Sequence, residues 1–149
     1  MRILFYGYGN PGRQDDGLGI LFIEELEKWI KDTGSENIET DSNYQLNIED
    51  AEIISSYDLV IFADASLEPI NGFDFTLVKS DDATIEFTMH AVSPAYVLDL
   101  CQKIYHKRPR THLLHIKGFE WELGGEMTVQ AKENLTLALN FIKDYLINL

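Results

Sequence analysis

Residues 7–19 read GYGNPGRQDDGLG, and the rest of the chain is organised around this stretch. A short apolar run, Ile3 to Tyr6, precedes it and predicts a buried strand. An amphipathic run, Leu18 to Ile30, follows it and predicts a helix. Glycine, asparagine and proline between two such runs are typical of a tight turn. The sequence therefore predicts a strand, a tight loop and a helix in immediate succession.

Two adjacent carboxylates, Asp15 and Asp16, stand where this helix is expected to begin. Aspartate is a good helix N-cap, and the helix dipole favours a negative charge there. One carboxylate is enough for a cap, and a second one beside it is repelled unless a positive charge lies close. A bound cation would supply that charge. We interpret Asp15 as a cap, with a role as a general base as the alternative.

The glycines at positions 7, 9 and 12 have the spacing of a dinucleotide-binding fingerprint. That motif presents free N–H groups and a positive helix end to a pyrophosphate. Here Pro11 lacks an N–H, and the carboxylates of Asp15 and Asp16 would repel a phosphate. The sequence therefore disfavours nucleotide binding at this loop.

Composition limits the class of protein. The chain has 149 residues, 45% of them hydrophobic, which suits one globular domain. Its formal net charge of −13 disfavours nucleic acids and anionic membrane surfaces, and it permits a cation or a basic protein partner. A single cysteine, Cys101, cannot form an internal disulfide and fits a reducing cytoplasm. We expect neither a signal peptide nor a transmembrane segment.

Further strands and helices alternate along the chain. Leu59 to Ala63 is an unbroken apolar run, typical of a strand buried on both faces. The pattern predicts additional strands at residues 38–46 (at an edge), 73–78 and 113–116, with a short extended piece at 84–88. Ser93 and Pro94 predict a helix start, and two more helices are expected at residues 47–56 and 128–149. The residues expected on the buried sides of the helices at 47–56 and after Pro94 are Ile48, Ala51, Ile54, Val97, Leu98, Cys101, Ile104 and Tyr105.

This alternation predicts a three-layer α/β/α sandwich around a mostly parallel sheet of about five strands. In such folds ligands bind beyond the carboxyl ends of the strands. Asp16 follows the first strand, Asp64 ends the central strand, and His90 precedes the helix that starts near Pro94. We therefore expect Asp16, Asp64 and His90 to converge at one edge of the sheet.

Two carboxylates and one imidazole form a mixed ligand set that suits divalent zinc, nickel, manganese or iron. Three protein ligands leave positions open for water or substrate, as in catalytic metal sites. Each residue also has a simpler explanation, since Asp16 can cap a helix, Asp64 can end a strand and His90 can be an ordinary loop histidine. The other histidines are interpreted as structural or surface residues, and two of them, His112 and His115, face opposite sides of one strand.

The same residues, taken in order, resemble the [NiFe]-hydrogenase maturation endopeptidases. The resemblance consists of Gly9-Asn10, the acidic loop Asp15-Asp16-Gly17, Asp64-Ala65 after an apolar strand, and a lone His90 before a helix. It extends over nearly the whole chain, residues 1–149. It implies a single maturation-protease-like domain with a phosphorylase/hydrolase-like α/β fold.

The resemblance also implies a function. Members of that family are cytoplasmic processing endopeptidases of the aspartic type, and they activate a hydrogenase by removing a C-terminal extension from its large-subunit precursor. The positions that bind nickel in that family correspond to Asp16, Asp64 and His90 of this chain. The resemblance also implies that the nickel arrives with the substrate. Other divalent ions, such as zinc or cadmium, would be able to take its place.

This chain departs from the family pattern in two places. Asp16 is one methylene shorter than the glutamate that some members carry. After Gly118, where many members have an apolar-x-Pro run, this chain has Phe119-Glu120-Trp121. The second departure concerns which substrate is recognised and leaves the metal ligands unchanged.

Several alternatives remain open from the sequence. A metal could polarise the scissile carbonyl or activate water, or it could only recognise the loaded substrate and position the bond. A non-enzymatic nickel carrier or sensor could use the same ligands. Another small hydrolase is a further alternative, because residues 9–12 resemble the opening of peptidyl-tRNA hydrolases. The acidic composition opposes RNA binding, however, and the downstream histidine of those enzymes is replaced by acids.

Overall fold

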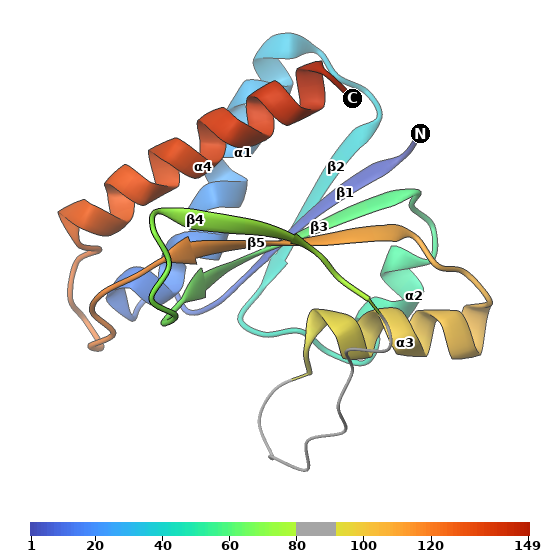
Figure 1. Ribbon diagram of the computed structural model, residues 1–149, viewed down its shortest axis with the longest axis horizontal. Coiled ribbons are helices and arrows are strands. Elements are labelled where there is room, and N and C mark those ends of the chain that lie inside the picture. The colour runs from blue at the N-terminus through green and yellow to red at the C-terminus, as the bar shows by residue number, and fades with distance from the viewer. Residues whose placement is uncertain (80–91) are drawn as a thin grey trace.

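The computed structural model describes residues 1–79 and 92–149. Within these residues one sheet of five strands is formed, in the order β2-β1-β3-β5-β4 (Figure 1). The strands are β1 (Ile3–Tyr8), β2 (Ile38–Asn43), β3 (Leu59–Ser66), β4 (Phe73–Leu77) and β5 (Arg110–Lys117). The pairs β1·β2, β1·β3 and β3·β5 are parallel, and β4 pairs with β5 in antiparallel fashion. The predicted mostly parallel sheet is therefore confirmed, with β2 at an edge.

Helices cover both faces of this sheet (Figure 1). A short 3-10 turn, η1 (Gln14–Gly17), leads into α1 (Leu18–Thr33), and α1 shares one face with α4 (Val129–Ile147). The other face is covered by α2 (Asp50–Ile54) and α3 (Pro94–Tyr105). The α/β/α sandwich is confirmed. The extended piece expected at 84–88, like His90, lies outside the described residues.

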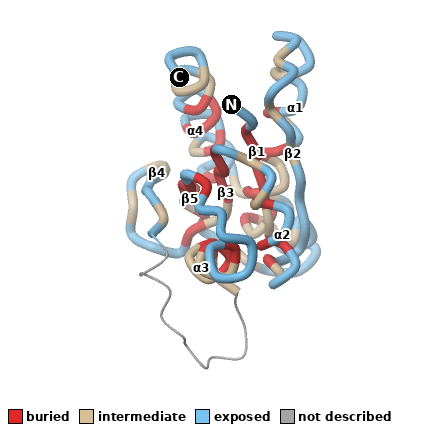
Figure 2. Tube along the Cα trace, turned by 90° about the vertical axis from the view of Figure 1, so that its right-hand side faces the viewer, coloured by how far each residue is buried: buried red, intermediate tan, exposed pale blue. Residues whose placement is uncertain are grey.

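The position of β3 between two layers of helices explains why its sequence is apolar without interruption. Leu59, Ile61 and Ala63 belong to the buried cluster beneath α1 and α4. Val60 and Phe62 belong to the cluster beneath α2 and α3. Successive side chains on a strand point to opposite faces, so a strand covered on both faces is apolar at every position. Figure 2 shows β3 buried between the other elements.

Local signals at the helix ends are also confirmed. Gly34 ends α1 in the left-handed conformation, with φ of 71°, and its N–H donates to the carbonyl of Ile30. Ser93 caps α3, because its hydroxyl oxygen accepts a hydrogen bond of 3.1 Å from the N–H of Tyr96. Pro94 occupies the first position of that helix, where no N–H is needed.

Three residues expected in the core are exposed. Ile48 precedes α2, which begins only at Asp50, and its side chain lies at the surface. Ile104 is 58% exposed and Tyr105 is also exposed, because both lie in the last turn of α3. The contacts of α3 with the core are made earlier, through Val97, Leu98 and Cys101. Helical periodicity therefore identified the buried face and overestimated how far along the helix it extends.

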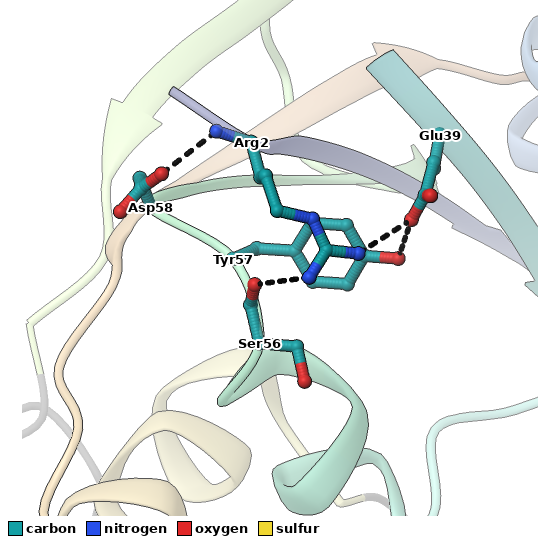
Figure 3. A network of polar contacts seen from close by, with 5 residues as sticks. All are labelled: Arg2, Glu39, Ser56, Tyr57 and Asp58. Atoms are coloured by element: carbon teal, nitrogen blue, oxygen red, sulfur yellow. Dashed lines mark hydrogen bonds and ion pairs between the residues drawn. The ribbon is translucent and has the colours of Figure 1, made fainter. Parts of the chain in front are cut away.

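A polar network ties the strands together at their amino ends (Figure 3). The backbone N–H of Arg2 donates to Asp58 at 2.7 Å, and its guanidinium donates to the carbonyl of Ser56 at 3.0 Å and to Glu39 at 3.2 Å. Tyr57 donates to the same Glu39 carboxylate, and its ring lies 4.7 Å from the guanidinium carbon. This network links β1, β2 and the start of β3 at the end of the sheet opposite to Asp16 and Asp64.

Among the described helices, none combines the length and apolar character needed to cross a membrane.

Candidate active site

The first turn of α1 lies against the carboxyl ends of two strands. A Cβ atom at Gly19 would stand 2.5 Å from the carbonyl oxygen of Ala63 in β3 and 2.6 Å from that of Tyr8 in β1. Both obstacles are backbone atoms, so only glycine allows this approach. Gly9 has φ of 136°, and a Cβ there would overlap the carbonyl oxygen of Asp16. These contacts bring η1, with its two acids, to the end of β3.

The loop between β1 and η1 satisfies its own backbone donors. The N–H of Asn10 donates to Asp16 Oδ2 at 2.9 Å, and the N–H of Gly12 donates to Asn10 Oδ1 at 2.9 Å. The N–H of Arg13 donates to the carbonyl of Asn10 at 3.1 Å. A phosphate would need such donors to be free. The geometry therefore agrees with the expectation that this loop does not bind a nucleotide.

Asp64 lies near the end of β3, and its side chain is partly buried. Burial and the nearby charge of Asp16 raise the pKa of Asp64 to about 7, against the opposing effect of hydrogen bonds from the Ala65 N–H and the Tyr8 hydroxyl. The structure thus brings Asp16 and Asp64 close enough for their charges to interact. A pair of carboxylates that resists full ionisation is a pair that a divalent cation would stabilise.

The third predicted ligand cannot be placed, because His90 lies outside the described residues. Within residues 1–79 and 92–149, no group of three histidine, cysteine, aspartate or glutamate side chains is arranged to hold a metal ion. The described part of the chain therefore supplies two carboxylates, Asp16 and Asp64. Their oxygen donors fit a divalent metal that takes further ligands from elsewhere.

Tyr8 is a site residue that sequence reasoning missed. It is the last residue of β1, and its hydroxyl hydrogen-bonds the carboxylate of Asp64. Burial, followed by the charge and the hydrogen bond of Asp64, raises the pKa of Tyr8 well above its usual value, so the hydroxyl keeps its proton. The signal available in the sequence was a tyrosine at the last strand position before the glycine loop.

Asp15 plays a different part from the one expected. Its residue is 0% exposed, and its carboxylate accepts hydrogen bonds from the N–H groups of Phe119, Glu120 and Thr128 and from the Thr128 hydroxyl. Burial acts to raise the pKa of Asp15, but these four hydrogen bonds together lower it. Asp15 therefore anchors the segment that connects β5 to α4.

The helix-cap interpretation of Asp15 and Asp16 is wrong. Arg13 and Gly17 occupy the N-cap positions of η1 and α1, and neither start carries a side-chain cap hydrogen bond. The carboxylates point elsewhere, because Asp16 bonds the preceding loop and Asp15 bonds the β5–α4 connection. The close packing of Gly19 on the strands supports this helix start instead.

The remaining candidates are structural, as expected. Cys101 is buried in the core beneath α3, and burial raises the pKa of its thiol, which disfavours the reactive thiolate. His112 stacks on Phe75 with ring centroids 4.4 Å apart, and it lies near Tyr145 of α4. His115 is three residues further along β5 and therefore faces the opposite side.

No protein-family model matches this sequence, and no curated protein sequence does. Solved structures, in contrast, are similar over nearly the whole chain. The [NiFe] hydrogenase maturation protease HycI from Thermococcus kodakarensis KOD1 is 20% identical, with a TM-score of 0.77, and the likeness covers 96% of this chain and 90% of that chain. The hydrogenase maturating endopeptidase HybD from E. coli is 20% identical, with a TM-score of 0.76 and coverage of 99% and 93%.

A third structure, the hydrogenase 2 maturation peptidase from a Thaumarchaeota archaeon, is 18% identical, with a TM-score of 0.69 and coverage of 98% of both chains. The fold of this protein is therefore that of an α/β protein of the hydrogenase maturation protease type. These solved structures are hydrogenase maturation proteases, the family that the sequence around Asp16 and Asp64 resembles. At about 20% identity, the likeness shows the shared fold.

Proposed function

We propose that this protein is an endopeptidase that removes the C-terminal extension of a [NiFe]-hydrogenase large-subunit precursor after nickel has been inserted. The fold supports this proposal, because its solved neighbours are hydrogenase maturation proteases. The observation that carries it is the interacting carboxylate pair, Asp16 and Asp64, at the carboxyl ends of β1 and β3. That edge is where ligands bind in folds of this architecture.

In this proposal Asp16, Asp64 and His90 are the ligands for a nickel ion that arrives with the precursor. The nickel belongs to the substrate. When bound, it would either polarise the scissile carbonyl or position the bond to be cut. Two carboxylates and one imidazole leave coordination positions for the groups of the precursor that already hold the ion.

The protein's own hydrogen bonds prepare the two carboxylates for this task. The N–H of Asn10 holds one oxygen of Asp16 at 2.9 Å. The Tyr8 hydroxyl and the Ala65 N–H hold Asp64. Hydrogen bonds of this kind orient metal ligands before the metal arrives, which reduces the cost of binding.

Asp15 is assigned a supporting role in this proposal. Its two oxygens already accept four hydrogen bonds, and its residue is fully buried. A general base needs an oxygen free to accept a proton from water or substrate. Asp15 instead holds the β5–α4 segment next to the loop that carries Asp16.

The test is a processing assay with purified precursor, either nickel-loaded or nickel-free, and substoichiometric protein. We expect many turnovers on the loaded precursor and a loss of at least about 100-fold in Asp16→Asn, Asp64→Asn and His90→Ala. Asp32→Asn, at an exposed position near the end of α1, is the matched control and should process normally. Folding of each variant is checked by circular dichroism.

Three results would count against this proposal or a part of it. Nickel release in a one-to-one ratio without shortening of the precursor would indicate a carrier or sensor. Normal processing by all three folded ligand variants would show that the site is elsewhere. Equal cutting of loaded and nickel-free precursor would exclude nickel as a recognition element.

A further inference from the structure

The segment between β5 and α4, residues 119–126, forms an exposed surface beside the carboxylate pair. It borders a hollow of about 640 Å³ whose lining residues are Gln14, Phe119, Glu120, Trp121, Glu122, Leu123, Gly124 and Gly125. Phe119 is 46% exposed and Leu123 is 76% exposed. In Figure 1 this connection lies on the same side of the molecule as the start of α1. Large apolar side chains are thus presented to solvent next to the proposed active site.

The same surface carries unpaired negative charge. Glu120, Glu122 and Glu126 are exposed, and none of them forms an ion pair with any residue in ranges 1–79 and 92–149. Two cations contact this segment without forming an ion pair with its carboxylates, and the Nζ of one of them, Lys117, lies 5.6 Å from the centre of the Phe119 ring. Arg13 Nε donates to the carbonyl of Trp121 at 3.3 Å, and Lys117 Nζ donates to the carbonyl of Leu67 at 3.0 Å.

The surface is held rigidly against the loop that carries Asp16. Asp15 accepts hydrogen bonds from the N–H groups of Phe119 and Glu120 at 2.7 and 3.1 Å. Gln14 accepts from the N–H of Glu122 at 2.8 Å, and its amide donates to the carbonyl of Glu126 at 3.0 Å. A surface that is already ordered binds a partner without a large entropic cost.

A further backbone bond, from the N–H of Gly124 to the carbonyl of Gly12 at 2.9 Å, joins the segment to the glycine loop itself. Just before the segment, the N–H of Gly118 donates to the carbonyl of Ser66, at the end of β3, at 3.0 Å. Ser66 lies two residues after Asp64. Residues 119–126 and the carboxylate pair are therefore parts of one hydrogen-bonded unit.

We propose that residues 119–126 dock a stretch of the substrate protein that carries lysine or arginine beside apolar side chains, and thereby select which precursor is processed. The inference rests on the proposed function and names the chemistry of its substrate. The Glu120 carboxylate accepts a hydrogen bond of 3.1 Å from the Gln14 amide, so the carboxylates that favour a cationic partner are those of Glu122 and Glu126. Exposed Phe119 and Leu123 favour apolar side chains next to the cation. Phe119-Glu120-Trp121 is also where this chain departs from the pattern of the family it resembles.

The binding test uses a synthetic ten-residue peptide, blocked at both ends, with two arginines among leucine and glycine. The control peptide has citrulline in place of each arginine, which keeps the shape and removes the charge. Amide chemical shifts of the isotope-labelled protein are followed during titration. We expect the shifts to concentrate on residues 119–126 and Gln14, and the citrulline peptide to bind at least about fivefold more weakly.

Two variants test the surface directly. The double variant Glu122→Gln/Glu126→Gln should weaken binding of the arginine peptide about three- to tenfold, because charge pairs at an exposed rim contribute modestly. The matched control, Glu24→Gln/Glu36→Gln, removes two exposed carboxylates elsewhere and should change binding less than twofold. Leu123→Ala should weaken binding, and Ile147→Ala, at an exposed position at the far end of α4, should not. Equal effects of the two charge variants would overturn the proposal.

The design separates failure of docking from failure of the proposed function. Peptide binding is measured in the wild type and in Asp16→Asn/Asp64→Asn, where no processing is expected. If the wild type binds the peptide at residues 119–126 but processes no precursor, the proposed peptidase activity is refuted and the docking proposal is supported. If Glu122→Gln/Glu126→Gln processes the precursor normally with an unchanged KM, the docking proposal is refuted and the proposed peptidase activity is supported. With docking correct, the KM of that variant rises while kcat stays the same.

Discussion

Asp15 and Thr128 are joined by two hydrogen bonds, one from the Thr128 N–H and one from its hydroxyl, each 2.8 Å long. The same Thr128 oxygen accepts from the N–H of Ala131 at 3.2 Å and so caps α4. A chain of hydrogen bonds therefore runs from η1 to the first turn of α4, although 113 residues separate the two ends in sequence. Hydrogen bonds linked in series in a buried place strengthen one another.

The first prediction is that Asp15→Asn strongly destabilises the protein. An asparagine has one oxygen where Asp15 has two, and its NH₂ group would face a backbone N–H or the Thr128 hydroxyl. Leaving buried donors without acceptors should lower the free energy of unfolding by about 2–4 kcal/mol, measured by urea denaturation. Asp32→Asn, at an exposed position, should change it by less than about 0.5 kcal/mol. A loss below about 1 kcal/mol for Asp15→Asn would contradict the anchoring role.

The second prediction concerns the pH dependence of stability in the metal-free protein. Burial and the charge of Asp16 raise the pKa of Asp64 to about 7, whereas an unfolded chain loses this proton near pH 4. Between these values the folded state binds more protons than the unfolded state, so the contribution of Asp64 to stability falls as pH rises.

Asp64→Asn removes this dependence, because an amide does not titrate and can still accept from Tyr8. We expect the variant and the wild type to differ little near pH 4, and the variant to be more stable by about 2 kcal/mol or more at pH 8. Urea denaturation in the presence of a chelator, at several pH values, measures the difference. A constant difference across this range would show that the pKa of Asp64 is normal.

The third prediction compares two changes at Asp16. Asp16→Glu keeps a carboxylate ligand and lengthens it by one methylene, so we expect processing to stay within about tenfold of the wild type. Asp16→Asn removes the charge and should cost at least about 100-fold. Both are measured in the precursor assay. Similar activity of the two variants would mean that Asp16 acts only through its hydrogen bond with Asn10.

The fourth prediction concerns the close approach of α1 to the sheet. In Gly19→Ala, the new methyl group meets the carbonyl oxygens of Ala63 and Tyr8, at 2.5 and 2.6 Å before relaxation. Backbone atoms cannot rotate away, so the helix must shift, at a cost of about 1–3 kcal/mol. Because η1 moves with α1, processing should fall as well.

Gly34→Ala is the comparison for this change. Nothing stands within 4 Å of the new methyl group there, and only the left-handed backbone of the helix end is disfavoured. We expect a cost of about 1 kcal/mol in stability and unchanged processing. Equal loss of activity in the two variants would show that Gly19 matters only for stability.

The order of strands and helices followed from local patterns. The apolar run at Leu59 to Ala63, the glycine at position 34 and the Ser93-Pro94 pair each correspond to an observed feature, because each depends on neighbours in the sequence. The meeting of Asp16 with Asp64 also followed from the sequence. The carboxyl ends of adjacent parallel strands must lie at one edge, and β1 and β3 are adjacent. The placement of His90 stays a prediction.

What the sequence by itself determined was the class of fold, the position of the glycine loop and the edge where the two acids meet, since these depend on periodicity and on strand polarity. Only the tertiary structure decided that Asp15 anchors the segment before α4 and that Tyr8 bonds Asp64, as it also decided that Ile104 and Tyr105 face solvent. Those outcomes depend on partners that are distant in the chain. A local pattern shows that a carboxylate is present, but the packed fold decides which donors surround it.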